Sequence, residues 1–404
     1  MKENAVARWT KYLFVAVLLL VVGYVLTVQV LRWVAYGEDE QDAVALMRQV
    51  PSPPTGESGF KYLAYAGKDA PDEALGAALD ADVAAFAEYH ERYAERLVDG
   101  SGIAMEPPAT PGADSLPSLA PVPTPEFACD FSQEDCVTAL RGHENAARAW
   151  LDAAAPRTRR VEQALASNHL ANPYALNAAM PFPGYQQLSL PLNEIALQAL
   201  EGDVPNARPR ACFLLANARR HLRNDGFLID KLVFASLAQG ASDLLLRVHS
   251  LDPSAPLPDE CGAAIAPVDI NDFQVCNALR SEFAMMSEFS RQMDEANDGW
   301  RTPTRWVFTS HRLQDGWTAT HLAPFCTTEG QAAIARGEVP AFRAGDYDSI
   351  DSWAAPLSYS IASMGYPAYG DYQQRLLDHF HALRGNLEAI ARIEAPAPGP
   401  KAAD

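Results

Sequence analysis

The segment CDFSQEDC, residues 129–136, places two cysteines seven positions apart, with carboxylates at Asp130, Glu134 and Asp135 between them. Thiols beside carboxylates could bind a metal, carry out redox chemistry or close a disulfide. The spacing differs from the C-x-x-C of structural zinc sites and thioredoxin-like centres, and the nearest histidine in the sequence is His143. In an oxidising compartment the segment therefore predicts a local disulfide.

The chain contains six cysteines, and an even number in an exported protein indicates a disulfide framework. The sequence does not select one connectivity, so proximity along the chain is the guide. Proximity favours the local bridge first and the next nearest cysteines second, which leaves the remaining two to pair. The predicted pairs are Cys129–Cys136, Cys261–Cys276 and Cys212–Cys326.

Histidines and acidic residues elsewhere do not complete a known site pattern. Residues 90–91 and 143–144 begin like the zinc-hydrolase motif H-E-x-x-H, but no second histidine follows at the required spacing. His379 and His381 are two apart on a predicted helix, so their side chains point in different directions. Nucleophile-elbow, phosphate-loop and dinucleotide motifs do not occur. We therefore expect no metal and no cofactor.

One stretch concentrates positive charge on a chain whose formal net charge is −19. Its basic side chains fall on a predicted helix, where they could form a docking patch for an acidic partner or an anionic envelope polymer. The alternative is a solvated helix face opposite an apolar stripe. The residues are Arg208, Arg210, Arg219, Arg220, His221 and Arg223.

A second open feature is the stretch NPYALNAAMPFPGYQQLSLPL, residues 172–192, which has no period and contains four prolines. Such a loop either packs over helices or lines a groove, and long ordered loops are often functional. Both interpretations stay open from the sequence.

The compartment is indicated by the N-terminal region. Residues 1–11 carry three cations, and the largely apolar residues 12–34 are long enough, at about 1.5 Å per residue, to span a ~30 Å hydrocarbon core. Acidic residues follow at 38–42. This charge distribution predicts a cytoplasmic N-terminus, a single-pass anchor in the inner (plasma) membrane and a periplasmic body. A cleaved signal peptide is the alternative, although this apolar core is longer than usual.

Proline-rich stretches suggest how the chain is divided. We expect few contacts to cross the proline-rich linker, because it has no periodicity and is semi-extended. The predicted parts are a cytoplasmic N-terminus (1–11), an anchor (12–34), a membrane-proximal helical segment (35–100), the linker (101–126), a main helical domain (127–394) and a disordered tail (395–404).

Apolar residues that recur every three or four positions predict a mainly α fold. Two of these helices, 211–222 and 229–248, resemble one α-solenoid helix pair, although no second copy occurs at a fixed period. Residues 300–325 cannot be assigned, and Asp315-Gly316 within them is a candidate hairpin turn. The other predicted helices cover 72–97, 273–293 (with Asp272, or alternatively Asn271, as the N-cap) and 371–393.

Several segments together resemble an uncharacterised family of single-pass, membrane-anchored, exported helical proteins of xanthomonad-type bacteria. The resemblance implies location and helical class, and it implies no activity, cofactor or catalytic residue. Besides the anchor and the cysteines, it depends on FKYLAYAGKDAPDEAL (60–75), AMPFPGYQQLSLPLNEIALQALEGDV (179–204), SDLLLRV (242–248), LRSEFAMM (279–286) and YGDYQQRL (369–376).

The acidic composition makes nucleic acid an unfavourable partner, because like charges repel. We expect a non-enzymatic envelope protein that acts as a helical scaffold, adaptor or immunity-type binder of a protein partner. The alternative is an anchored hydrolase that acts on cell-wall polymer or peptide. A deep polar cleft with two carboxylates of separated pKa would favour the hydrolase.

Overall fold

The computed structural model describes residues 5–49, 54–98, 108–131, 135–177, 179–224, 226–295, 309–341, 350–363 and 366–394. These ranges are mainly helical and contain no β-strand, only two isolated β-bridges. The predicted mainly α fold is therefore confirmed. The predicted disordered tail, 395–404, lies outside the described residues.

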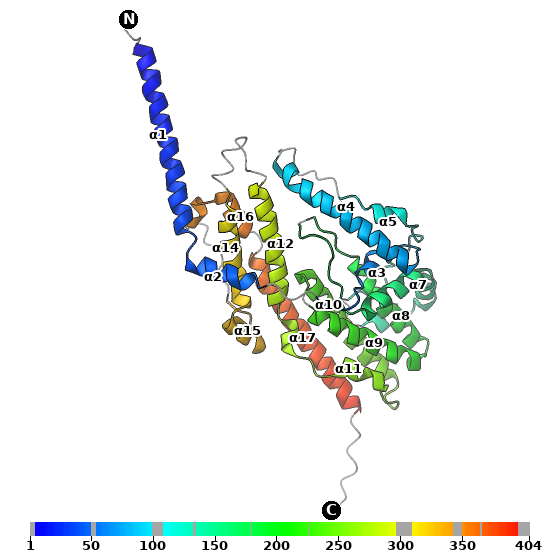
Figure 1. Ribbon diagram of the computed structural model, residues 1–404. Helices are drawn as coiled ribbons and strands as arrows, with labels where there is room; N and C mark the ends of the chain where they lie inside the picture. The colour runs from blue at the N-terminus through cyan, green and yellow to red at the C-terminus, as the bar shows by residue number, and fades with distance from the viewer. Residues whose placement is uncertain are drawn as a thin grey trace, which may run out of the picture.

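Helix α1 (Ala5–Val34) projects from the body as a separate rod (Figure 1). Its segment Arg8–Val34 is long and apolar enough to cross a membrane, and only 6% of the 18-residue window that meets this criterion is buried. The predicted anchor, 12–34, falls within this segment. At its C-terminal end α1 meets the body through a small apolar cluster, which includes Leu31 and Ala35 and residues of α14 (His311–Leu322) and α16 (Pro356–Ser363).

The membrane-proximal segment forms α2 (Glu38–Met47), α3 (Phe60–Ala64) and α4 (Asp72–Val98), and α5 (Pro111–Ser115) follows in the proline-rich stretch. Their apolar side chains belong to the same core cluster as those of the main domain. Helix α3 packs on α7 (Glu144–Ala166), and α2 packs on α14. The expectation that few contacts cross the proline-rich stretch is therefore wrong.

The centre of the body is α10 (Leu228–Leu251), which packs against α9 (Val204–Arg223) and α17 (Tyr366–Glu394). Its small and apolar side chains are buried on both sides. The solenoid-like stacking is not confirmed, because the last helix of the chain lies along α10 rather than a following helix pair (Figure 1).

The remaining elements complete the shell around this centre. Two predicted boundaries differ from the structure: the helix expected from 273 begins at Cys276, after a separate 3-10 turn, and the one expected from 371 begins at Tyr366. The elements are α6 (Cys136–Leu140), η1 (Tyr185–Ser189), α8 (Leu190–Leu200), η2 (Asp259–Cys261), α11 (Gly262–Ile265), η3 (Ile270–Phe273), α12 (Cys276–Glu295), η4 (Ala323–Phe325), α15 (Thr328–Ala335) and η5 (Ile350–Trp353).

The hairpin turn predicted at Asp315-Gly316 is wrong, because both residues lie inside α14. Gly316 faces α2 closely: an added Cβ would lie 3.1 Å from Tyr36 Cε2 and 3.1 Å from Glu40 Cβ. The glycine therefore permits close helix packing, a role that a sequence pattern does not separate from that of a turn.

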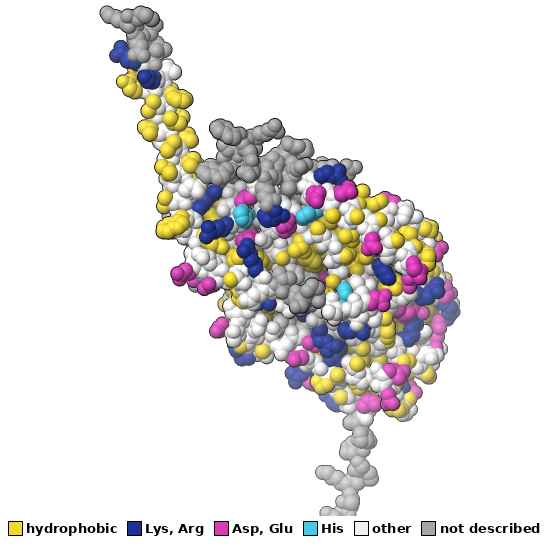
Figure 2. Space-filling model, viewed as in Figure 1, with side chains coloured by type: hydrophobic (Ala, Val, Ile, Leu, Met, Phe, Trp, Pro, Cys, Tyr) yellow, Lys and Arg dark blue, Asp and Glu magenta, His cyan; other side chains and the backbone are white. Residues whose placement is uncertain are grey.

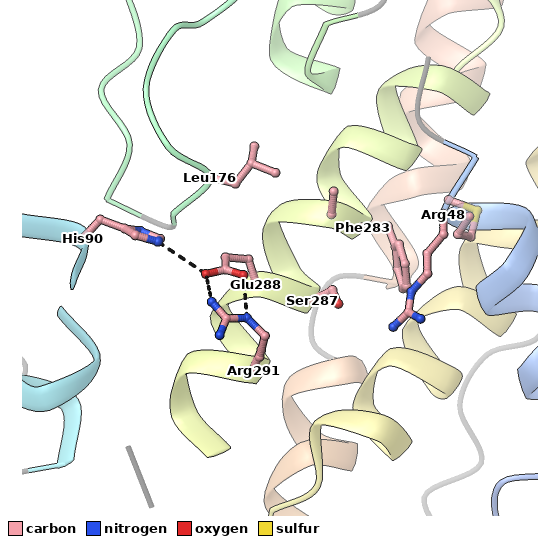
Figure 3. Close-up of a pocket in the computed structure, with 9 residues that line it drawn as sticks. Arg48, His90, Leu176, Phe283, Ser287, Glu288 and Arg291 are labelled. Carbon is pink, nitrogen blue, oxygen red and sulfur yellow. Dashed lines mark hydrogen bonds and ion pairs between the residues drawn. The ribbon is translucent and has the colours of Figure 1, made fainter. Parts of the chain in front are cut away.

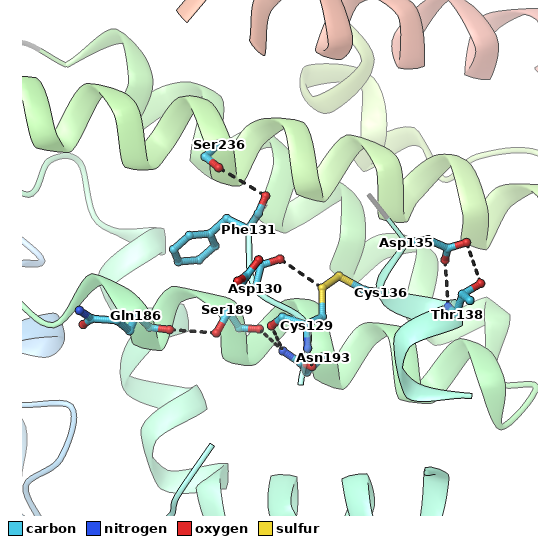
Figure 4. The surroundings of a disulfide bond; sticks show 10 residues. All are labelled: Cys129, Asp130, Phe131, Asp135, Cys136, Thr138, Gln186, Ser189, Asn193 and Ser236. Atoms are coloured by element: carbon cyan, nitrogen blue, oxygen red, sulfur yellow. Dashed lines mark hydrogen bonds between the residues drawn. A yellow bond between two sulfur atoms is a disulfide. The ribbon is translucent and has the colours of Figure 1, made fainter. Parts of the chain in front are cut away.

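Three disulfides join the six cysteines. The local bridge Cys129–Cys136 is confirmed, and Figure 4 shows it beside Asn193, whose side chain accepts a hydrogen bond from the Cys129 N–H (2.8 Å) and donates one to its carbonyl (2.8 Å). The other two predicted pairs are wrong: the bridges are Cys212–Cys261 and Cys276–Cys326. Proximity in sequence failed because η2 returns Cys261 to α9, whose Cys212 Cα lies 5.0 Å away.

Candidate functional site

The predicted basic docking patch does not lie on the surface. Arg208 is buried and donates hydrogen bonds to the carbonyls of Ala255 (2.9 Å) and Asp252. Arg210 is half-buried and forms ion pairs with Glu162 (2.7 Å) and Glu194 (2.9 Å). These arginines join α9 to neighbouring segments, and neither side chain is exposed.

The C-terminal half of the cluster is also internal. Arg219 is buried and donates to the carbonyls of Ala264 (2.6 Å), Ala266 (2.7 Å) and Pro267 (3.0 Å). Arg220 and His221 both bind the carbonyl of Leu165, at 2.7 and 3.0 Å. Of the six predicted residues, Arg223 is exposed. Neither the docking patch nor the solvated face describes this cluster, because four of its side chains bind backbone carbonyls and Arg210 binds two carboxylates.

A cleft of about 380 Å³ opens on the face that carries the end of α2. Four segments distant in sequence line it: Met47 and Arg48 at the end of α2, His90 on α4, Leu176 in the loop before η1, and residues 283–291 of α12. Figure 3 shows these side chains converging from α4, α12 and α2. In Figure 2, hydrophobic surface gathers on this face between α12 and α4, with basic, acidic and histidine side chains along it.

His90 and Glu288 form the polar side of the cleft. His90 Nε2 lies 3.3 Å from Glu288 Oε1, and the amides of Gln292 (2.8 Å) and Asn177 (3.1 Å) approach its two ring nitrogens. Arg291 forms an ion pair with Glu288, and this hydrogen bond lowers the pKa of that carboxyl below its usual value. The Glu288 carboxylate is therefore held in its charged form, and it is oriented between the His90 ring and the Arg291 guanidinium.

Arg48 occupies the other end of the cleft. Its guanidinium donates to the buried carboxylate of Asp315 (3.1 Å), and the Ser287 hydroxyl donates to the same oxygen (2.7 Å). Burial raises the pKa of Asp315. Because the Ser287 hydroxyl donates to a carboxylate and not to a histidine, this arrangement does not supply the nucleophile and oriented base of a hydrolytic triad.

The floor between these two ends is apolar. Met47 and Phe283 are buried there, while Leu176 is partly exposed. An apolar floor flanked by a few oriented polar groups is typical of a binding site, in which the polar groups fix orientation. The cleft can thus hold an apolar side chain next to a carboxylate or another polar group, which Arg48 or Arg291 would contact.

Two carboxylates at the start of α10 also have raised pKa values, but they do not form a catalytic pair in a cleft. Burial raises the pKa of Asp230 to about 6 and also raises that of Glu282. Both cap the N-terminus of α10: Asp230 accepts the Phe227 N–H (2.8 Å) and Glu282 the Leu228 N–H (3.1 Å). Because the two pKa values shift in the same direction and the cavity beside Asp230 is about 20 Å³, room for one water, these residues do not favour the hydrolase.

Sequence reasoning missed most of the cleft. In the sequence, His90 belongs only to an incomplete zinc motif, and no pattern singles out Arg48, Glu288 or Arg291. The loop 172–192 is the exception, since lining a groove was one of its two interpretations and Leu176 does so. Nearby Tyr174 instead packs edge-on against Phe86, so the loop has both roles.

Within the described ranges, no three histidine, cysteine, aspartate or glutamate side chains gather as ligands for a metal ion. Searches against protein-family models, curated proteins and solved structures found no match to this chain. The resemblance to the xanthomonad-type exported proteins stays a prediction.

Proposed function

We propose that the protein is a single-pass, membrane-anchored envelope protein with a periplasmic body, which acts as a non-enzymatic scaffold, adaptor or immunity-type binder. The length and apolar surface of α1 support the anchor. Cations precede the apolar segment and acids follow it, which supports a cytoplasmic N-terminus. All six cysteines are in disulfides, as is usual for proteins of an oxidising compartment.

Retention of α1 is favoured over cleavage by its contacts with the body. Arg32 donates to the carbonyls of Ala354 (2.9 Å) and Thr309 (2.7 Å), and Ala35 is buried in the cluster that includes Trp317. A signal peptide that is removed after export has no reason to build a packed junction with the mature protein.

The observation that carries the binding function is the cleft at the end of α2. Arg48 and Arg291 have exposed side chains at its two ends, over an apolar floor, on a chain that is otherwise acidic. A guanidinium has five donors, so each arginine can contact a partner carboxylate while keeping its internal one. We infer that the partner is a protein segment that presents an acidic group next to an apolar side chain.

Site-specific photo-crosslinking tests this function. A photoreactive amino acid at Leu176, in the full chain in native membranes, should give a specific crosslinked product. That product should be lost in an Arg48→Ala/Arg291→Ala variant. It should persist in Arg336→Ala, which is the matched control. Arg336 is also exposed and forms an ion pair with a nearby glutamate, but it follows the end of α15 and lies outside the cleft. Equal crosslinking in both variants would show that the cleft is not the binding site.

A second experiment tests the topology. A reporter that is active only outside the cytoplasm, fused to the C-terminus of the full chain, should be active. A cytoplasmic reporter at the same place should be inactive. The opposite result would contradict the proposed orientation and, with it, the oxidising environment of the body.

A further inference from the structure

The most exposed large apolar side chain in the described part of the body, Trp353, lies on the element that packs on the end of α1. Trp353, the last residue of η5, is 70% exposed, and Leu357, in the first turn of α16, is 47% exposed. They are four positions apart. Trp33, in the last turn of α1, is 83% exposed. Tryptophan side chains are seldom this open to water, and exposed apolar side chains that gather in one place mark an interaction surface.

The position of η5 relative to α1 is fixed by direct contacts. The two elements pack side by side, and the Arg32 guanidinium holds the carbonyl of Ala354, the residue after Trp353. Val28, six residues before the end of α1, is also buried (2%), so the body covers about the last 9 Å of the helix. Figure 1 shows α16 beside the last turns of α1 rather than beyond its end.

This position lies at the depth of lipid headgroups if α1 spans a membrane. The 27-residue window Arg8–Val34 is about 40 Å long, close to the ~40–45 Å of a bilayer with its headgroup layers. The last turns of α1, and η5 with them, then fall in the outer headgroup layer, where tryptophan side chains are enriched.

We propose that η5 and the first turn of α16 form a membrane foot, defined by Trp353 and Leu357, which inserts into the headgroup layer next to α1. The inference rests on the proposed anchoring of α1. The surface fits a zwitterionic lipid, because the exposed acids Glu38 and Asp39 directly after α1 would repel anionic headgroups. Two contacts, one spanning and one interfacial, would fix the tilt of the body and the direction in which its cleft opens.

The test measures membrane depth with a fluorescent label on single introduced cysteines. Because all six native cysteines are in disulfides, one added thiol can be labelled selectively. The full chain would be placed in phosphatidylcholine vesicles that carry a nitroxide either at the headgroup or deep in the acyl chain. The variants are Trp353→Cys, Leu357→Cys, Trp33→Cys and Tyr24→Cys, and a thiol titration confirms that the three bridges remain.

Leu251→Cys is the matched control. Leu251 is 52% exposed, similar to Leu357, and ends α10. His249, two residues earlier, pairs with Glu394 at the end of α17, which Figure 1 places on the side of the body away from α1. A label there should keep its fluorescence with both nitroxides.

Labels at 353 and 357 should lose fluorescence with the headgroup nitroxide to about the same extent as a label at 33, which lies in the tryptophan-rich interface. A label at 24 should be quenched best by the deep nitroxide. If 24 is quenched but 353 and 357 behave like 251, the foot is wrong and the anchor stands. A blue-shifted but unquenched label at 353 would mean that protein, such as a second copy, covers the surface, which also overturns the foot. An unquenched label at 24 would overturn the anchor and the foot together.

Discussion

Asp82 on α4 holds Gly112 on α5 across the proline-rich stretch: its buried carboxylate accepts the Gly112 N–H at 2.6 Å. The same carboxylate accepts the hydroxyl of Tyr65 at 2.6 Å, so one side chain joins three segments. An added Cβ at Gly112 would lie 1.9 Å from the Ala78 carbonyl oxygen, so the two backbones approach as closely as only glycine allows.

We predict that Asp82→Ala destabilises the whole body. The variant leaves the Gly112 N–H and the Tyr65 hydroxyl without their acceptor in a buried site, which costs about 3 kcal/mol of unfolding free energy. Denaturant unfolding of the full chain in detergent measures this loss. Asp80→Ala, an exposed carboxylate on the same helix, should change stability by less than about 0.5 kcal/mol. A small loss in both variants would mean that α5 contributes little to the fold.

The disulfides should differ in their effect on stability. Cys212–Cys261 and Cys276–Cys326 have sequence separations of 49 and 50, and Cys129–Cys136 one of 7. Replacing either long-range pair by alanines should therefore cost about 4 kcal/mol, against about 2 kcal/mol for the local pair, if restriction of the unfolded chain dominates. Thermal unfolding of the three double variants measures the order.

Peptide mapping without reduction checks the pairing itself. Peptides containing Cys212 and Cys261 should be linked, and so should those containing Cys276 and Cys326. A linked Cys261–Cys276 peptide would contradict the structure and restore the pairing expected from proximity.

Arg219 and Arg223 should respond very differently to truncation. Arg219→Ala removes the donors of several buried carbonyls between Ala263 and Pro267, so we expect a loss of about 2–4 kcal/mol. Arg223→Ala, on the same helix but exposed, should be nearly neutral. Unfolding curves of the two variants provide the comparison, and equal losses would contradict the internal role of Arg219.

His221 should make the protein less stable in acid. Burial lowers its pKa from 6.5 to about 4, so between these values the unfolded chain binds a proton that the folded chain excludes. The unfolding free energy therefore falls as the pH falls from about 6.5 to 4, by about 3 kcal/mol from this residue. His221→Gln should show a flatter pH profile from pH 7 to 4, whereas His381→Gln, at an exposed position, should keep the wild-type slope. Parallel profiles for both variants and the parent would refute the assignment.

Regular helices were predictable because their apolar periodicity matches the face they bury. The stripes in 211–222 and 229–248 became α9 and α10, with most of the expected side chains in the core, although Ile229 is exposed. The basic cluster was misinterpreted because Arg219 binds carbonyls of residues 263–267, whose approach to α9 depends on the Cys212–Cys261 bridge and not on any local pattern.

The cleft could not be predicted for a similar reason. Arg48, His90, Leu176 and Glu288 come from four separate segments, and their spacing in sequence carries no motif. Their meeting depends on α2 and α4 packing on α12 across a proline-rich stretch that the sequence suggested was a boundary. Prolines indicate an extended backbone, but they do not indicate whether that backbone lies free or packs against a helix.

The Cys276–Cys326 bridge has a mechanical consequence. It joins Cys276, the first residue of α12, to Cys326, the residue after η4. Element η4 directly follows α14, and α2 and the end of α1 pack on α14. Next to the bridge, the Val275 N–H binds Gln373 of α17 at 3.3 Å. If α1 spans a bilayer and the body holds a partner, as we propose, a pull between them would pass through one covalent crosslink instead of the fifty-residue loop that it closes. Tension would then reach α17 without first unfolding α12, which lines the cleft, or α14, which contacts the end of α1.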